Sequence, residues 1–406
     1  MVAPQPYFSA RGTPFSVMHR IRALLNHGHD IDLLTYGYGE NLEFPTSKGN
    51  FNIIRSKRIA GINSVKIGPS IAKLLLDVIL YFDTKKALER KSYDLVHSHE
   101  EASFWVMPLC KKNSIPHLYD MHSSLPQQLS NFKAFNLKPF RMIFNRLENK
   151  VLDNCDGVIT ICKDLEKIVK QVVPNKPHSM IENIGDDRKV FRPSEENITE
   201  IFKLQNLKVV LYTGTFEAYQ GIDLLLESLQ IICKKDKGIA VMLVGGRKNQ
   251  IEHYRTLAKK LGVYEFVRFS GTVHPSRIPN FIDASDVIVS PRSRGTNTPL
   301  KIYNYLRTGI PIVATNRLTH TQTLNTNICC LVEPTPTSFA EGILTTLNDP
   351  IYAQKIAKNA VKFSEQYFSD KHYIEMVNSI VQQTLQAFNK RIQVKKDENS
   401  AVTNLP

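Results

Sequence analysis

Histidine and carboxylate side chains gather in two short stretches of the first half of the chain. His97, His99 and Glu100 follow one apolar run, and Asp120 and His122 follow the next. A histidine in a loop that follows a strand is a candidate for a functional site, and Asp120 can orient the His122 ring through Nδ1, although both residues can also be structural. We take His122 and Asp120 as candidate catalytic residues and the other three as candidate contacts for a polar ligand. A metal site is the alternative, but no further ligand stands at a fixed spacing from His97 and His99.

Three cationic side chains share one stretch of the second half. Arg292, Arg294 and Lys301 lie between residues 292 and 301, after another apolar run. Phosphate groups are bound by such cations and by the backbone N–H groups of a helix N-terminus, and Pro299 suits the first turn of a helix that starts there. This stretch is therefore expected to bind a phosphorylated or polar ligand.

Alternating strand-like and helix-like segments must position these residues. The expected strands of the first half are residues 30–36, 93–97, 117–120 and 157–161, with helices at 16–26 and 71–88. The series restarts near Lys208, with strands at 208–213, 240–244, 267–269, 287–290 and 312–315 and a helix at 222–233. Such alternation indicates two parallel, doubly wound α/β sheets. Ligands of these sheets bind beyond the carboxyl ends of the strands, where the candidate residues stand.

The composition is that of a globular protein with a basic surface. Of 406 residues, 42% are hydrophobic and 22% are charged, and 52 Lys and Arg against 38 Asp and Glu leave a net charge of +14. The basic residues stand in short, scattered groups such as Lys85-Lys86 and Lys111-Lys112, which are typical of solvated helix faces. Attraction to an anionic membrane surface, also through the basic edge of the helix at 71–88, is the alternative. No nucleic-acid-binding motif is visible, so no nucleic-acid partner is expected.

Cysteine usage and hydropathy bear on the compartment. The six cysteines stand mostly in apolar runs and include no Cys-x-x-Cys pair, which favours free thiols in a reducing, cytoplasmic compartment. No apolar run reaches the length of about 18 residues that spans a bilayer. Residues 1–4 resemble the end of a strand, and we expect translation to start a few residues upstream.

Short motifs occur along the chain in a fixed order. They are Gly12-Thr13-Pro14, Gly28 to Leu33, Ile181-Glu182-Asn183, Tyr212-Thr213-Gly214, Val267 to Val273, Ala284 to Val287, Pro299 to Leu306 and Gly309 to Thr315. In this order they resemble the retaining glycosyltransferases of family 4, and the resemblance runs nearly end to end. It implies the GT-B fold, in which two Rossmann-like, doubly wound α/β domains face each other across a cleft.

The resemblance and the restarted strand series together predict the domain limits. Residues 1–190 are expected to form an acceptor-binding domain and residues 195–362 a nucleotide-sugar-binding domain, with the junction where Pro193 and its polar neighbours interrupt the pattern. A C-terminal helix within Phe363–Phe388 is expected to return to the first domain. Residues 389–406 are polar and basic, and we expect them to form a disordered tail.

The implied activity is transfer of a hexose, with retention of anomeric configuration. The donor would be a nucleotide diphosphate sugar, and the acceptor a glycan or a lipid-linked molecule. The nucleotide sugar is a co-substrate, and the resemblance implies neither a cofactor nor a metal. The enzyme is expected in the cytoplasm, with the inner membrane face as a site of peripheral attachment.

The resemblance places the site residues at the strand ends, with His122 near the donor sugar. The expected donor-binding residues are Gly214, Thr215, Gln220, Gly245, Thr272, Val273, Arg292, Arg294, Thr296, Asn297, Thr298, Pro299, Leu300 and Asn304. Those expected on the acceptor side are Gly12, Thr13, His97, His99, Glu100 and Asn183.

Four positions depart from the family pattern. The family's acidic and basic pairs correspond here to Thr296 with Asn304 and to Thr215 with Gln220. We expect Lys301, helped by Arg292 or Arg294, to supply the missing positive charge and to act as a catalytic residue. Asn304 is expected to hydrogen-bond the sugar or the ribose. The alternative is a degenerate, inactive relative.

Two other functions remain open. A nucleotide-sugar epimerase shares the fold and would use carboxylates of the first domain, for which Glu100 and Glu101 are the candidates. A non-catalytic glycan- or nucleotide-binding relative would account for the four departures. A nicotinamide dehydrogenase is not expected, because Gly245-Gly246 lack the rest of the Gly-x-Gly-x-x-Gly fingerprint.

Overall fold

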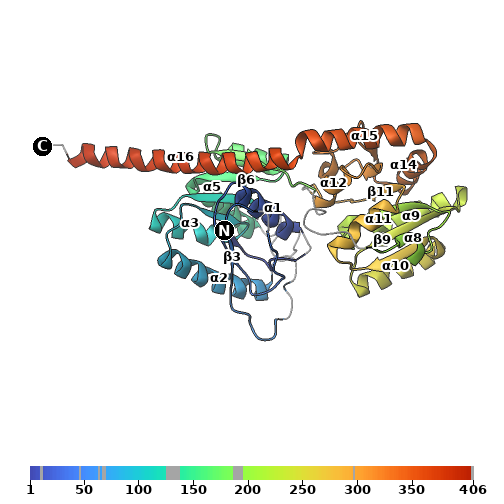
Figure 1. Ribbon diagram of the computed structural model, residues 1–406, viewed down its shortest axis with the longest axis horizontal. Coiled ribbons are helices and arrows are strands. Elements are labelled where there is room, and N and C mark those ends of the chain that lie inside the picture. The colour runs from blue at the N-terminus through green and yellow to red at the C-terminus, as the bar shows by residue number, and fades with distance from the viewer. Residues whose placement is uncertain are drawn as a thin grey trace. The chain divides into compact units, whose positions relative to one another are not determined.

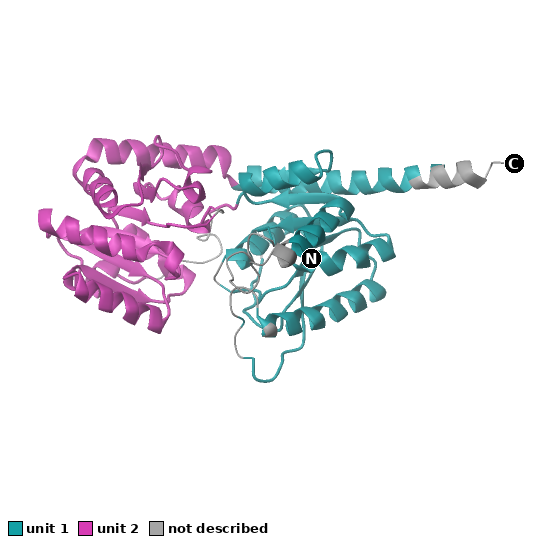
Figure 2. Ribbon diagram, turned by 180° about the vertical axis from the view of Figure 1, so that it is seen from behind, with its two compact units in different colours: residues 1–182, 370–406 teal, residues 183–369 magenta. Residues whose placement is uncertain are grey.

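A computed structural model shows two compact units, coloured separately in Figure 2. The first unit combines Met1–Glu182 with Asp370–Pro406, and the second is Asn183–Ser369. The structure describes residues 1–403 apart from 10–11, 45–46, 63–64, 66–69, 125–137, 186–194 and 296–297.

The first unit is built on a parallel sheet of seven strands in the order β3-β2-β1-β4-β5-β6-β7. Its strands are Val2–Ala3 (β1), Ile31–Thr35 (β2), Phe51–Arg55 (β3), Val96–His99 (β4), His117–Met121 (β5), Gly157–Thr160 (β6) and His178–Met180 (β7). The register pairs His97 with Leu118 and His99 with Asp120. Strands β4 and β5 therefore end side by side, and their candidate residues lie at the same edge of the sheet.

Helices cover both faces of this sheet (Figure 1). They are Gly12–Asn26 (α1), Ile71–Arg90 (α2), Ala102–Asn113 (α3), Lys138–Asn154 (α5), Lys163–Val172 (α6) and Asp370–Thr403 (α16). Helices α2 and α3 bury Leu76, Leu80 and Val106 against strands β1, β2 and β4. Helices α5 and α6 share a second apolar cluster with β5 and β6 that includes Val158. On the other face, α16 packs against α1 and β6, where its Thr384 lies over Gly157.

The second unit has a parallel sheet of six strands in the order β10-β9-β8-β11-β12-β13. Its strands are Lys208–Thr213 (β8), Ile239–Val244 (β9), Val267–Gly271 (β10), Val287–Ser290 (β11), Ile312–Thr315 (β12) and Cys330–Val332 (β13). The helices are Ile198–Ile201 (α8), Ile222–Lys235 (α9), Lys248–Lys260 (α10), Ile278–Asp283 (α11), Leu300–Tyr305 (α12), Leu318–Thr321 (α13), Pro336–Asn348 (α14) and Pro350–Tyr367 (α15). Short 3-10 turns are Ala218–Gln220 (η2), Tyr264–Phe266 (η3) and Pro275–Arg277 (η4). Strands β8 and β9 are almost wholly buried, as strands covered by helices on both faces must be.

The predicted class, two doubly wound Rossmann-like α/β domains, is confirmed. The C-terminal region differs from the prediction. The helix that joins the first unit begins at Asp370, inside the expected range 363–388, but it runs beyond that range to Thr403, and residues 363–367 belong to α15 of the second unit. The expected disordered tail is instead helical to Thr403. Its Lys, Gln and Glu residues are good helix formers, and extending an existing helix avoids the cost of nucleation.

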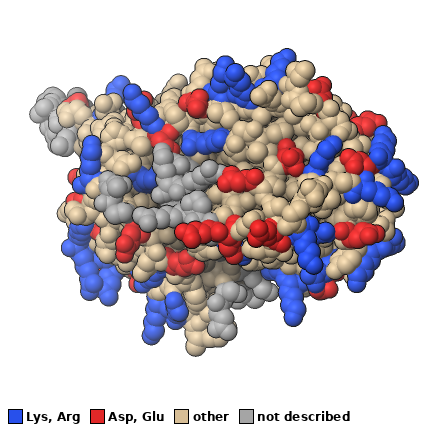
Figure 3. Space-filling model, turned by 45° about the vertical axis from the view of Figure 1, so that its right-hand side comes forward, with Lys and Arg blue, Asp and Glu red and all other residues tan. Residues whose placement is uncertain are grey.

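Figure 3 shows the basic and acidic side chains on one face of the molecule. In the face drawn in Figure 3, Lys and Arg side chains occur throughout, with Asp and Glu side chains among them. Among the described residues, no helix is both long and apolar enough to cross a membrane.

Candidate functional site

The candidate residues of the first unit converge on the carboxylate of Asp120. Arg20 of α1 donates from Nε to Asp120 Oδ2 at 2.9 Å, and His97 Nε2 lies 3.3 Å from the same oxygen. His122 Nε2 lies 3.4 Å from the other oxygen, Oδ1, and 3.0 Å from His99 Nδ1. All five side chains are buried. The result is one connected network of an arginine, a carboxylate and three imidazoles.

The charges of this network are set by burial and by Arg20. Burial alone would raise the pKa of Asp120, but the Arg20 guanidinium, helped by His122 and His97, lowers it well below its usual value. Burial lowers the pKa of His97, and burial together with His97 lowers that of His99 still further. Asp120 is therefore an ionised carboxylate paired with Arg20, and His97 and His99 are neutral at pH 7.

Arg20 also connects distant parts of the unit. Its Nη2 donates to the carbonyl oxygen of Ile181 at 3.0 Å, and its Nη1 donates to the hydroxyl of Tyr373 in α16. Arg20 was not predicted as a site residue from the sequence. The available signal was a charged residue within the apolar helical segment Val17 to Ile21, because a buried arginine requires partners.

Two expectations for this region need correction. His97 and His99 were expected as polar contacts on a ligand-facing surface, but they are 2% and 0% exposed. They end a strand that is covered on both sides, so they hold Asp120 and His122 in place. Asp120 was expected to face Nδ1 of His122, whereas the nearer ring nitrogen is Nε2. Glu100 accepts a hydrogen bond from Thr13 Oγ1 at 3.1 Å and thereby joins β4 to the start of α1, next to Gly12.

The same cluster offers three metal-ligand atoms within 4.8 Å of one another, from His97, His99 and Asp120. Two features oppose a metal ion there. The Arg20 guanidinium already occupies the Asp120 oxygen, and a second cation would have to displace it. The His97 and His99 rings stack at 4.6 Å with 23° between their planes, so their in-plane lone pairs do not converge on one point. The geometry fits a hydrogen-bonded network better than a metal site.

In the second unit, two glycines bring the ends of β8 and β9 together. Gly214 has φ 137° and Gly245 has φ 119°, values that favour glycine. A Cβ at Gly245 would lie 2.0 Å from the carbonyl oxygen of Gly214. Thr272, which precedes Val273, donates from Oγ1 to the Gly246 carbonyl at 2.9 Å. These strand ends present bare backbone, which can approach a ligand closely.

Lys301 reaches back from α12 to the end of β8. Its Nζ donates to the carbonyl oxygen of Thr213 at 3.1 Å and lies 3.8 Å from the ring centroid of Tyr212. Burial, followed by repulsion from Arg292, lowers the pKa of Lys301 well below its usual value. The hydrogen bond and the ring contact hold the Lys301 amino group at the end of β8.

Arg292 stands beside the same edge. Its Nε donates to the carbonyl oxygen of Arg294 at 2.8 Å, and its guanidinium lies 5.1 Å from the ring centroid of Tyr219. Burial lowers its pKa. Among the described residues, neither Arg292 nor Lys301 makes an ion pair with an Asp or Glu. Arg294 is exposed.

His320 supports the loop that carries Arg292. It was not predicted from the sequence, because a lone histidine in α13 carries no spacing signal. Its Nε2 lies 2.8 Å from Ser290 Oγ, and its Nδ1 lies 2.9 Å from the carbonyl oxygen of Thr315. Burial lowers the pKa of His320 to about 3, so the ring is neutral. Thr315 Oγ1 in turn donates to the Arg292 carbonyl at 2.6 Å. Strands β11 and β12 thus support the loop that carries Arg292.

The remaining predicted donor residues lie at or near this edge. Gln220 Nε2 donates to Thr215 Oγ1 at 3.4 Å, so these two substituted positions contact each other. The hydroxyl oxygens of Thr298 and Thr323 lie 3.0 Å apart. Thr298 directly precedes Pro299, the N-cap of α12, and Leu300 is the first residue of that helix. A Cβ on Gly185 would lie 2.3 Å from the backbone N of Asn304, so the segment after the buried Asn183 packs on α12. Thr296 and Asn297 lie outside the described residues.

Comparison with known families identifies the class. Residues 10–187 match the family described as Glycosyltransferase Family 4, and residues 194–363 match Glycosyl transferases group 1. The chain belongs to these family 4, group 1 glycosyltransferases, as its motifs predicted.

Curated relatives match over part of their length. YtcC of Bacillus subtilis (strain 168), described as a glycosyltransferase, is 26% identical over 263 residues, which are 60% of this chain and 64% of the relative. D-inositol 3-phosphate glycosyltransferase of Corynebacterium efficiens is 25% identical over 248 residues, 58% of this chain and 57% of the relative. The matched regions therefore span less than two thirds of each relative.

Solved structures share the fold along almost the whole chain. Sucrose-phosphate synthase of Thermosynechococcus elongatus has a TM-score of 0.74 at 20% identity and covers 95% of this chain and 99% of its own. Anabaena HepE in complex with UDP-glucose has a TM-score of 0.68 at 15% identity and covers 94% of this chain and 99% of its own. At these identities the likeness concerns the fold, which is GT-B.

Proposed function

We propose that the protein transfers a hexose from a nucleotide diphosphate sugar to a glycan or lipid-linked acceptor, with retention of anomeric configuration and without a metal ion. The second unit would bind the donor and the first unit the acceptor. Family membership supports glycosyl transfer, and Anabaena HepE, which shares the fold, was solved with UDP-glucose.

The observation that carries the proposal is the pair of cations without a counter-anion at the end of β8. Lys301 and Arg292 are half-buried, and among the described residues no carboxylate pairs with them. Placing two like charges in such a site is unfavourable unless an anion joins them. A diphosphate would supply that anion and would raise the pKa of Lys301, so the amine would carry a full charge when the donor is bound.

The same cations would act in the reaction. As the bond to the sugar breaks, negative charge grows on the leaving diphosphate, and fixed donors aimed at that charge lower the barrier. Lys301 would supply a point charge, and Arg292 a planar fork. In the first unit, the Arg20-bound Asp120 would hold His122 where the sugar is transferred.

Replacement of Lys301 by alanine tests this site. We expect kcat/KM with the preferred nucleotide sugar to fall by roughly 10- to 1000-fold, the order lost with one charge-stabilising donor. Nucleoside diphosphate affinity, measured by calorimetry, should also fall. Lys260→Ala, at an exposed position on α10, is the matched control and should behave as wild type.

The comparison also decides between activity and mere binding. Wild-type turnover and wild-type diphosphate affinity of Lys301→Ala would disprove the role of this residue. If the unmodified protein binds nucleotides but transfers no sugar in a panel of UDP-, GDP- and ADP-sugars, the inactive-relative alternative is correct instead.

A further inference from the structure

The outer helices of the first unit expose an unusual share of large apolar side chains. Seven of the fourteen such side chains found among the described residues lie on α2 and α5. They are Leu74, Leu75, Val78 and Phe82 on α2 and Met142, Ile143 and Leu147 on α5, with 40% to 65% of each side chain exposed. Their spacing on α2 follows the helical repeat, so they form a stripe that faces away from the sheet.

On both helices these residues lie mainly towards the same edge of the sheet. Each helix connects parallel strands of one sheet, so α2, α3 and α5 all run in the opposite direction to the strands. The first half of each helix therefore lies towards the carboxyl edge of the sheet, where His122 and Glu100 are found. The exposed apolar residues occupy mainly that half, and we call the seven of them the apolar band.

Cations follow in the second half of the same three helices. They are Lys85, Lys86 and Arg90 on α2, Lys111 and Lys112 on α3, and Lys150 on α5. Against these six stand Asp83, Glu89 and Asp153, while Glu148 is buried. None of the six ammonium or guanidinium groups makes an ion pair within the described part of the chain. We call these six residues the basic band.

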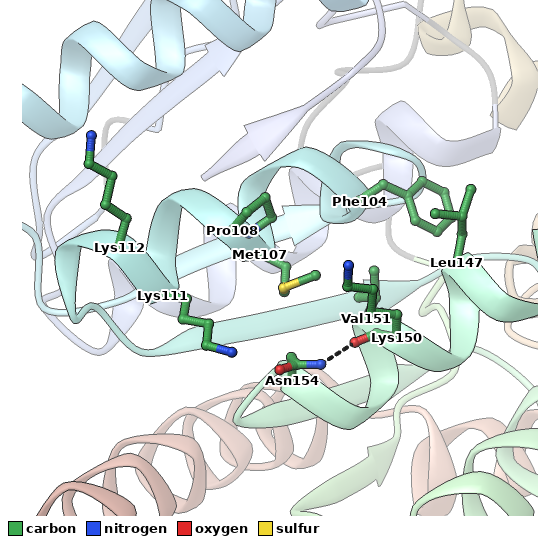
Figure 4. Close-up of a pocket in the computed structure, with 9 residues that line it drawn as sticks. All are labelled: Phe104, Met107, Pro108, Lys111, Lys112, Leu147, Lys150, Val151 and Asn154. Carbon is green, nitrogen blue, oxygen red and sulfur yellow. Dashed lines mark hydrogen bonds between the residues drawn. The ribbon is translucent and has the colours of Figure 1, made fainter.

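A pocket of about 450 Å³ lies between α3 and α5, where the two bands meet. Its apolar wall includes Phe104, Met107 and Leu147. Figure 4 shows Met107, Lys111 and Lys150 extending into the space between the helices. An apolar floor beside ammonium groups suits a hydrocarbon chain joined to an anionic headgroup.

We infer that the apolar and basic bands dock the first unit on the surface of an anionic lipid bilayer. The apolar band enters the boundary between headgroups and acyl chains, and the basic band contacts the anionic headgroups. The apolar band lies at the carboxyl edge of the sheet, so docking brings that edge to the membrane. The inference rests on the proposed function in one respect, because it selects a lipid-linked acceptor over a soluble glycan.

Sedimentation of the full-length protein with vesicles tests the inference. We expect binding to vesicles of phosphatidylcholine mixed with phosphatidylglycerol, weaker binding to phosphatidylcholine alone, and loss of binding at high salt. The double variant Leu74→Glu with Phe82→Glu should bind at least about tenfold more weakly, since it places charge in the apolar band. Ile351→Glu, at an 81% exposed position of the second unit, is the matched control and should bind as wild type.

The basic band is tested separately. Lys111→Glu with Lys150→Glu should reduce binding to anionic vesicles by about tenfold or more, whereas Lys260→Glu with Lys358→Glu, an equal charge change at exposed positions of the second unit, should not. Absence of binding to anionic vesicles, or equal binding by test and control variants, would overturn the inference. The inference would also be overturned if the wild-type protein were a dimer in sedimentation velocity and the apolar-band variant were a monomer. The apolar band would then be the interface with a second copy.

Nucleotide binding in the absence of vesicles separates this inference from the proposed function. If UDP, GDP and ADP all fail to bind while anionic vesicles do, the proposed function fails and the docking surface stands. If a nucleotide binds while vesicles do not, the docking inference alone is wrong.

Discussion

Arg20 and Lys301 are both basic side chains that pack against the protein, but they differ in their partners. Arg20 is fully buried and pairs with Asp120, so its charge is neutralised within the first unit. Lys301 has a carbonyl oxygen and an aromatic ring as partners, neither of which carries a full negative charge. A paired buried charge supports structure, whereas an unpaired one at a strand end indicates a site for an anionic ligand.

The Arg20 pair bears on metal dependence. We expect turnover to be unchanged by EDTA, because the one described group of metal-ligand side chains, His97, His99 and Asp120, already holds the Arg20 guanidinium. The measurement is initial rate with and without chelator, followed by addition of Mg²⁺ or Mn²⁺. Activity that disappears on chelation and returns with either ion would show that the protein depends on a metal.

At the scale of single elements, the ends of strands in the second unit can pack closely because glycines there carry no side chain. The end of β9 touches the end of β8 at Gly245 and Gly214, and the isolated bridge from Gly245 to Gly271 joins β10 to the same edge. The closeness of these three strand ends allows one bound group to contact several loops at once.

Gly245→Ala tests this packing. The new Cβ would lie 2.0 Å from the Gly214 carbonyl oxygen at φ 119°, and backbone atoms cannot move aside as a flexible side chain can. We expect a loss of about 2 to 4 kcal/mol in the free energy of unfolding of the second unit, together with weaker nucleotide binding. The control is Gly262→Ala, where φ is 71° and nothing lies within 4 Å, with an expected loss of about 1 kcal/mol. Equal losses in chemical denaturation would contradict the prediction.

At the scale of the whole molecule, the chain completes its first unit only with its last helix. α16 crosses α1 and β6, and the hydroxyl of Tyr373 accepts the hydrogen bond from Arg20 Nη1. Residues at the two ends of the chain therefore meet in the network that holds Asp120. The second unit has its own apolar core around β8, β9, α9 and α14.

Tyr373→Ala should therefore act on one unit only. Removal of a ring that is 3% exposed, and of a partner of Arg20, is expected to cost about 3 to 5 kcal/mol of unfolding free energy. Tyr373→Phe keeps the ring, and we expect a smaller loss of about 1 to 3 kcal/mol from the unpaired guanidinium donor. In hydrogen exchange, protection of β5 and α1 should decrease while that of β8 and β9 is unchanged. A matching decrease in both units would show that they unfold as one.

The local sequence pattern was sufficient to predict much of the fold and the position of the loop that carries Arg292 and Arg294. The strands Lys208–Thr213, Val287–Ser290 and Ile312–Thr315 have the predicted limits, because continuous apolar runs bounded by polar residues and glycine mark buried parallel strands. The stretch from Arg292 to Lys301 was found in the same way, since a loop after a buried strand must lie at the carboxyl edge.

Only the tertiary structure decided which side chains face one another. The 353 positions between Arg20 and Tyr373, and the 100 between Arg20 and Asp120, leave no periodic signal in the chain. The burial of His97 and His99 was likewise invisible, because exposure depends on the helices that cover a strand and not on the strand's own residues. Sequence alone determined where several strands lie, such as Lys208–Thr213, since these depend on neighbours a few residues away. It left Phe51–Arg55 and Cys330–Val332 unpredicted and placed a strand at 93–97 where the structure has Val96–His99. Side-chain pairing, burial and the resulting shifts in pKa depend on packing between distant segments, so only the folded structure determines them.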